Sequence, residues 1–196
     1  MKEELKFLII NTSEENLTEI FLFNKSKKSE IRIEENRNHL KNLIPSIKEI
    51  LLKENLELNQ LDFISLNEGP GSWTGLRIGF ATVKVLAMLS KIPLITFNNF
   101  ELISNESSLT QFVLLIKCSE TNYFYRHVDN NQILSEGVIS EINLLENFSK
   151  IEKLYMIQDL ELIIETVLKK YKNNLFVNPF DIEPMYLAEG VISSKK

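Results

Sequence analysis

The segment from Gly75 to Ser90 limits how this chain can fold more than any other feature, because it has helical spacing and apolar residues in nearly every direction. Gly75 and Gly79 stand one helical turn apart and allow a neighbouring backbone to approach closely. A helix that is apolar all round has to be covered all round. One face can lie on a sheet, and the opposite face then needs a second helix of the same chain or another protein.

A second helical segment, residues 38–53, supplies only part of that cover. Its apolar residues form one stripe opposite a polar face, at Leu40, Leu43, Ile44, Ile47, Ile50 and Leu51. Pro45 lies inside this pattern and removes one backbone donor, so the helix is kinked there or begins near it. The partly covered segment favours a hydrophobic protein interface, with burial inside the monomer as the alternative.

Short strand-like runs surround the two helices in a recognisable order. Three precede the first helix and one lies between the two helices, namely Leu5–Ile10, Leu17–Phe23, Glu30–Glu34 and Leu61–Leu66. The order is therefore βββαβα. A meander of strands followed by alternating helices and strands is how ribonuclease-H-like and actin-like ATPase lobes are built.

The second half of the chain predicts a smaller version of the same pattern. Three strands, a short helix and a longer helix are expected at Phe112–Lys117, Tyr123–Val128, Ile133–Ser140, Ile142–Phe148 and Leu160–Tyr171. The sequence thus predicts an α/β protein with a mixed sheet and two lobes, residues 1–100 and a reduced lobe at 101–196. The lobe boundary is expected around Asn98 to Thr110.

Composition excludes several classes of protein. The chain has 196 residues, 44% of them hydrophobic, and a formal net charge of -5, so it has no excess of basic residues with which to grip nucleic acid alone. Cys118 is its single cysteine, which predicts a reducing compartment, the cytoplasm. No apolar run approaches the ~20 residues of a membrane helix. We expect Cys118 to be a small buried residue rather than a nucleophile.

The loop before the apolar helix contains three glycines but does not match any of three known glycine-containing functional motifs. It has no lysine for a phosphate-binding P-loop, its third glycine is displaced from the dinucleotide pattern, and Ser72 adjoins Gly71 instead of standing at the centre of a nucleophile elbow. The sequence predicts a strand-to-helix turn in which Ser72 or Thr74 caps the helix, with a ligand-contacting loop as the alternative.

Histidine offers no metal site, because His39 and His127 are far apart in sequence and lack ligand spacing. We expect His39 to be an ordinary surface or interface residue at the start of the first helix.

One stretch has a specific resemblance to a known family. The loop and helix start comprise Gly69, Pro70, Gly71, Ser72, Trp73, Thr74, Gly75 and Arg77, followed by Ile78, Gly79, Ala81, Thr82, Lys84, Leu86 and Ala87. This stretch resembles the TsaB (YeaZ) family signature GPGSFTGLRIG-AT-KGLA, with Trp73 as the aromatic plug where the family has Phe. Three weaker echoes follow the family order at Phe7–Ser13, His39–Pro45 and Glu183–Leu187.

The resemblance implies an actin-like ATPase or ribonuclease-H-like fold and a non-catalytic scaffold role in the complex that forms N6-threonylcarbamoyladenosine in tRNA. It also implies a TsaD-like catalytic partner, recruitment of a TsaE-like ATPase, and self-association through the same two helices. The residues expected to bind the partner are His39, Leu43, Ile47, Ile78, Thr82, Val85 and Met88. No cofactor is expected on this chain alone; ATP and metal belong to the partner subunits, and tRNA is reached only through the complex.

The departures from the family pattern keep two enzyme alternatives in view. Asn11 replaces the Asp of the first turn, which weakens a metal or nucleotide role there, and the region around Lys117 to Phe124 has drifted from the family. A degenerate actin-like ATPase would use Thr12 and Ser13 at that turn. An M22-like peptidase would need the histidine pair of the TsaD branch, which the chain lacks.

Overall fold

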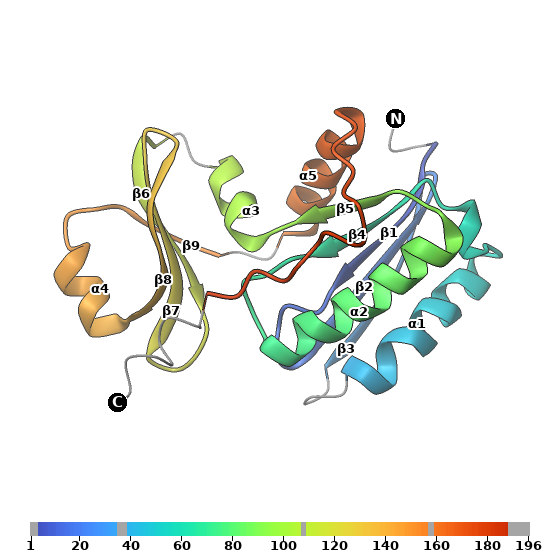
Figure 1. Ribbon diagram of the computed structural model, residues 1–196, viewed down its shortest axis with the longest axis horizontal. Coiled ribbons are helices and arrows are strands. Elements are labelled where there is room, and N and C mark those ends of the chain that lie inside the picture. Colours follow the sequence, from blue (N-terminus) through green and yellow to red (C-terminus); the bar gives the residue numbers. More distant parts are fainter. Residues whose placement is uncertain (1–3, 35–38, 107–108, 157–158, 188–196) are drawn as a thin grey trace.

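The computed structural model describes residues 4–34, 39–106, 109–156 and 159–187. It contains two sheets arranged as two lobes (Figure 1). The first lobe contains β1 (Lys6–Asn11), β2 (Leu17–Asn24), β3 (Lys27–Glu34), α1 (His39–Lys53), η1 (Leu58–Gln60), β4 (Phe63–Asn67), α2 (Trp73–Ser90) and β5 (Leu94–Phe97). The remaining elements are α3 (Asn99–Glu106), β6 (Gln111–Lys117), β7 (Asn122–Asp129), β8 (Gln132–Ser140), α4 (Glu141–Asn147), β9 (Lys153–Tyr155) and α5 (Leu160–Lys172).

The first sheet has the strand order β3-β2-β1-β4-β5. Strands β1, β2 and β3 form an antiparallel meander, and β4 and β5 extend the sheet in parallel beside β1. This topology confirms the βββαβα prediction and is the ribonuclease-H-like, actin-like ATPase fold.

Both faces of the first sheet are buried. Successive side chains of β1 point to opposite faces, and each face packs against helices. Leu8 and Ile10 face a core shared with α1 and α2. Phe7 and Ile9 face a second core shared with α5 and with Leu102 of α3. The continuous apolar run of β1 is therefore explained by a layer of helices on each face.

The second sheet repeats the first on a smaller scale. Its order, β8-β7-β6-β9, matches β3-β2-β1-β4 position for position, with a parallel β6–β9 pair and antiparallel pairs elsewhere. The prediction of a reduced second lobe is confirmed. The sequence prediction missed β5, α3, β9 and η1, which are the shortest elements or lie in the expected boundary.

The second half of the chain does not remain with the second sheet. Helix α5 packs on the first sheet, where Ile163, Ile164 and Val167 join Phe7 and Phe63 in one core. The predicted division at residue 100 separates the two sheets but assigns α5 to the wrong lobe. In Figure 1, α5 lies beside β5, far from α4.

Helix α1 runs from His39 to Lys53 with Pro45 inside it, so the alternative that it begins near Pro45 is wrong. No helix among the described residues combines the length and apolar character needed to cross a membrane.

Candidate partner-binding face

The signature loop connects β4 to α2 and is held by its own side chains. The hydroxyl of Ser72 accepts a hydrogen bond from the Gly75 amide at 3.2 Å and caps α2, as predicted. The Gly69 amide donates to the Asn67 side chain at 2.8 Å. The Ser72 amide donates to the Ser13 carbonyl oxygen at 2.6 Å, so the loop is fastened to the turn after β1.

Close packing explains the glycines at the start of α2. A Cβ atom on Gly75 would overlap the carbonyl oxygen of Thr12, and one on Gly79 would overlap the Thr12 hydroxyl. The neighbouring backbone that the spacing of these glycines predicts is therefore the chain's own β1–β2 turn. Their role is to let α2 lie directly on that turn.

A buried network of asparagines lies beneath the loop, formed by Asn11, Asn67, Asn99 and Ser13. The side-chain oxygen (Oδ1) of Asn11 accepts hydrogen bonds from the Ser13 amide (3.1 Å), the Ser13 hydroxyl (2.8 Å) and the Asn67 side chain (3.0 Å). Asn67 also donates to Asn99 at 2.7 Å, and Asn99 donates to the Pro70 carbonyl oxygen at 2.9 Å. This asparagine network consists of neutral groups bonded to one another.

Asn11 also donates to the buried carboxylate of Glu19 at 2.9 Å. The guanidinium of Arg32 lies 3.3 Å from the other oxygen of Glu19. The turn after β1 is thus tied to β2 and β3 by polar side chains.

His39 is buried, at 3% exposure, so the expectation of a surface residue is wrong. Its Nε2 atom lies 3.0 Å from the carbonyl oxygen of Glu15, which can only accept, so Nε2 carries the hydrogen. Its Nδ1 atom then accepts from the Thr18 hydroxyl at 2.6 Å. His39 anchors the start of α1 to the β1–β2 region instead of facing a partner.

The residues expected to bind a partner divide into three groups. Leu43 and Ile47, like His39, are buried in the chain's own core, because α1 turns them toward the sheet. Ile78 and Thr82 are partly buried on α2. Val85 and Met88 are exposed, at 52% and 41%.

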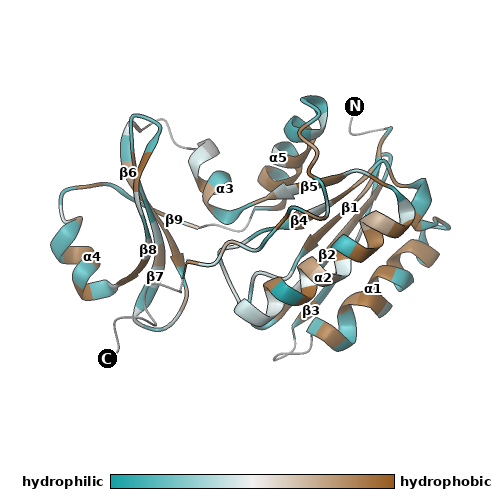
Figure 2. Cartoon of the chain, in the orientation of Figure 1, coloured by the Kyte–Doolittle hydropathy of each residue, from teal (hydrophilic) through white to brown (hydrophobic). Residues whose placement is uncertain are grey.

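Six exposed apolar residues of α1 and α2 form what we call the partner face: Leu40, Ile44, Leu52, Val85, Met88 and Leu89. Leu89 is 78% exposed. Figure 2 shows hydrophobic residues along both helices, and in this view no other helix or strand lies over them. The apolar helix is therefore not enclosed by its own chain within the part that the structure describes.

A pocket of about 240 Å³ opens between the two helices. It is lined by Ile44, Ile47, Lys48, Leu51, Leu52, Leu56, Leu58 and Leu86. Lys48 is the single charged residue of this lining, so the pocket suits an apolar side chain.

Trp73, expected as an aromatic plug, is 41% exposed. Its ring stacks on Tyr186, with centroids 4.0 Å apart, and the Arg77 guanidinium lies 4.2 Å from its centre. Arg77 also donates to the Tyr186 hydroxyl at 3.2 Å. The signature therefore meets the Glu183–Leu187 echo in space, a contact that no sequence spacing indicated.

Residues 178–187, which we call the strap, join the two lobes. Ile182 packs in the core under α2, whereas Met185 and Leu187 pack in the core of the second sheet. The Met185 amide donates to the Glu68 carbonyl oxygen at 2.8 Å.

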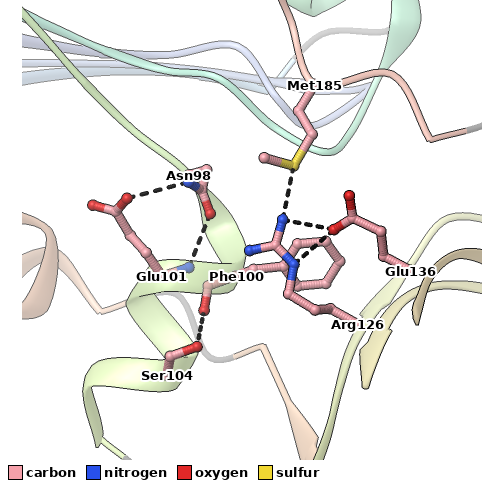
Figure 3. A network of polar contacts seen from close by, with 7 residues as sticks. All are labelled: Asn98, Phe100, Glu101, Ser104, Arg126, Glu136 and Met185. Carbon is pink, nitrogen blue, oxygen red and sulfur yellow. Dashed lines mark hydrogen bonds and ion pairs between the residues drawn. The ribbon is translucent and has the colours of Figure 1, made fainter. Parts of the chain in front are cut away.

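Figure 3 shows the junction between the lobes from close by. Arg126 of β7 bonds to Glu136 at 2.8 Å, reaches the sulfur of Met185 at 3.9 Å, and lies over the ring of Phe100 at 4.5 Å. Side chains from β7, α3 and the strap therefore meet at one point.

A second polar cluster joins α3 and α5 to the edge of the first sheet. The Lys170 ammonium lies 2.8 Å from Glu101 and donates to the Thr96 carbonyl oxygen at 2.7 Å. Nearby, burial raises the pKa of the Glu68 carboxyl above its ordinary value, with a smaller raising effect from Glu101, against the lowering effects of Thr96 and Lys170.

Cys118 is exposed, so the expectation of a buried residue is wrong. Desolvation around its sulfur nevertheless raises the pKa of the thiol above its ordinary value, which disfavours the nucleophilic thiolate. Among the described residues, no cluster of three His, Cys, Asp or Glu side chains is arranged to hold a metal ion.

Comparisons with known proteins agree on one family. The family model described as TsaD, tRNA N6-adenosine threonylcarbamoyltransferase, matches residues 31–189. The TsaB protein of Haemophilus influenzae, named for tRNA threonylcarbamoyladenosine biosynthesis, is 27% identical over 98% of both chains. A tRNA N6-adenosine threonylcarbamoyltransferase of Zymomonas mobilis is 35% identical, but over 33% of this chain and 18% of its own length.

Among solved structures, YeaZ from Pseudomonas aeruginosa superposes with a TM-score of 0.67 at 17% identity, covering 93% of this chain and 100% of that one. It shares both lobes of the fold. The chain belongs to the TsaB (YeaZ) family, within the wider family of the tRNA N6-adenosine threonylcarbamoyltransferase model.

Proposed function

We propose that this chain is a non-catalytic partner subunit of the complex that forms N6-threonylcarbamoyladenosine in tRNA. It binds a TsaD-like catalytic subunit through the partner face and helps to recruit a TsaE-like ATPase. The names of its relatives support the pathway. The observation that most supports the scaffold role is the exposure of the apolar partner face.

An apolar surface of this kind is costly in a free protein. Leu40, Leu52 and Leu89 are each more than half exposed and lie on two adjacent helices. Burying apolar surface contributes roughly 25 cal/mol per Å², so covering this face with a second pair of helices supplies a driving force for association. Exposed apolar patches mark protein interfaces in soluble proteins.

The asparagine network supports the absence of ATP hydrolysis by this chain alone. The amide and hydroxyl of Ser13 both donate to Asn11, and the Ser13 carbonyl oxygen accepts from Ser72. At the phosphate-like turn, these groups of Ser13 are occupied by the chain itself. We therefore assign ATP and metal to the partner subunits, and tRNA contact to the complex, in the cytoplasm.

The test is association with the TsaD-like protein of the same cell, measured by light scattering and titration calorimetry. We expect a heterodimer. Val85→Asp places a carboxylate at the exposed centre of α2 and should weaken binding at least tenfold, because the charge would be buried without a partner.

Leu145→Asp is the matched control, because Leu145 is a 60% exposed apolar residue on α4, far from α2 (Figure 1). It should bind as the unaltered chain does. Failure of the unaltered chain to form the heterodimer, or tight ATP binding by the isolated chain, contradicts the proposed role.

A further inference from the structure

The strap presents an exposed aromatic ring on a firmly held turn. Phe180 is 69% exposed, although its neighbour Ile182 is buried in the core of the first lobe. Most of this large apolar side chain is therefore left uncovered by its own chain. The turn that carries Phe180 is nevertheless held by several hydrogen bonds.

Three hydrogen bonds fix the backbone around this ring. The Phe180 amide donates to the Asn178 side chain at 3.2 Å, and the Asp181 amide donates to the Asn178 carbonyl oxygen at 3.0 Å. The Asn178 side chain donates in turn to the Asp181 carboxylate at 2.8 Å. Because this backbone is ordered before binding, the turn loses little conformational entropy when a partner covers it.

Lys84 joins this turn to α2. Its ammonium donates to the carbonyl oxygens of Phe180 and Ile182, at 3.4 and 3.1 Å. Met88, one helical turn further along α2, belongs to the partner face. Phe180 is therefore at the margin of the partner face, on the side of α2 away from α1.

The charges of the two helices indicate the chemistry of the occupant. Together, α1 and α2 carry one acidic residue, Glu49, and five basic residues, namely Lys41, Lys48, Lys53, Arg77 and Lys84, in a chain whose net charge is -5. On the side of the strap, the negative charges of Asp181 and Glu183 offset the positive charges of Arg77 and Lys84 on α2.

The positive excess therefore lies on the α1 side. Lys41, Ile44, Lys48 and Leu52 follow one another at helical spacing, so basic and apolar residues share one row there. A symmetric contact between two copies would bring two such positive helix pairs together.

We infer that the strap is a third element of the partner face, with Phe180 as an anchor for the TsaD-like subunit, which contributes carboxylates opposite Lys41 and Lys48. This rests on the proposed function for the identity of the partner. Aromatic side chains are frequent among the few residues that dominate binding energy.

The experiment measures the affinity of the full-length chain for the TsaD-like subunit by titration calorimetry. Phe180→Ala should weaken binding roughly tenfold or more, as expected of an anchor residue. Leu145→Ala, the truncation of a 60% exposed apolar residue on α4, should leave the affinity unchanged. Lys41→Glu with Lys48→Glu should weaken binding as well, and more strongly at low salt. Circular dichroism checks that each variant is folded.

The two proposals fail in different ways. If the unaltered chain does not bind, the proposed function fails and the inference fails with it. If the unaltered chain binds, Val85→Asp weakens binding at least tenfold and Phe180→Ala binds normally, only the role of the strap is overturned. A dimer of the chain alone that Phe180→Ala converts to monomer would assign the ring to a second copy and would also overturn the inference.

Discussion

Single side chains in the signature act mainly on packing. Gly71 and Gly75 both face the backbone of the turn after β1 at distances that leave no room for a Cβ atom. A family signature rich in glycine can therefore be required by the contact between a helix and a turn. Chemistry on a ligand is not needed to explain it.

Replacing Gly75 by Ala tests whether close packing or helix propensity determines the stability effect at this position. In an open helix the change would stabilise the chain by about 1 kcal/mol, because Ala has the higher helix propensity. Here a methyl group would meet the Thr12 carbonyl oxygen, and we expect a loss of about 2 kcal/mol in the free energy of unfolding. Urea denaturation measures this free energy of unfolding, and Thr74→Ala at a neighbouring exposed position is the neutral control. Stabilisation by Gly75→Ala would show that α2 does not lie against the turn.

Several residue-level features could be predicted and others could not. The cap at Ser72 follows from local sequence, because it depends on residues three positions apart. The burial of His39 and the stacking of Trp73 on Tyr186 depend on residues brought together by the tertiary fold. The partners in each pair are far apart in the sequence, so no local pattern connects them.

At the scale of elements, long periodic segments were predictable and short ones were not. Helices α1 and α2 and strands β1 to β3 have patterns that their burial explains. Strand β5 has four residues and β9 has three, too few to show a period. Helix α5 was predicted from its spacing, but it was assigned to the wrong lobe. The period of a helix shows which of its faces is apolar, but it does not show which part of the protein covers that face.

The placement of α5 can be tested with the fluorescence of Trp73, the only tryptophan, which lies in the first lobe. Ile164 is buried against the first sheet, so Ile164→Ala should cost about 2–5 kcal/mol and lower the unfolding midpoint seen by Trp73. Exposed Ile142→Ala on α4 should not change it. An unchanged midpoint for Ile164→Ala would mean that α5 does not stabilise the first lobe.

At the scale of the whole molecule, the two lobes are joined by polar contacts as well as by α3. Phe100 and Ile103 of α3 pack on the second sheet, whereas Leu102 packs on the first. Glu68 lies at this junction and holds the strap through its carbonyl oxygen. The Glu68 carboxyl is partly buried at the same place, so ionisation of this side chain should change the stability of the junction.

The sign of that response follows from the raised pKa of Glu68. The folded chain favours the protonated carboxyl, so this contribution to stability is complete below the ordinary pKa and is lost as pH rises through the raised value. Glu68→Gln removes the ionisation, and its melting temperature should exceed that of the unaltered chain at pH 8 but not at pH 4. Melting curves across this range check it. A difference that is independent of pH would contradict the assignment.

The return of α5 to the first sheet affects how the protein can be made on the ribosome. Strands β1 to β5 emerge first, but one face of their sheet, including Phe7, Phe23 and Phe63, is covered by a helix that begins only at Leu160. Until α5 has been translated, that face lacks its main cover and only Leu102 of α3 lies on it. Completion of the first lobe is therefore expected to wait until α5 has left the ribosome.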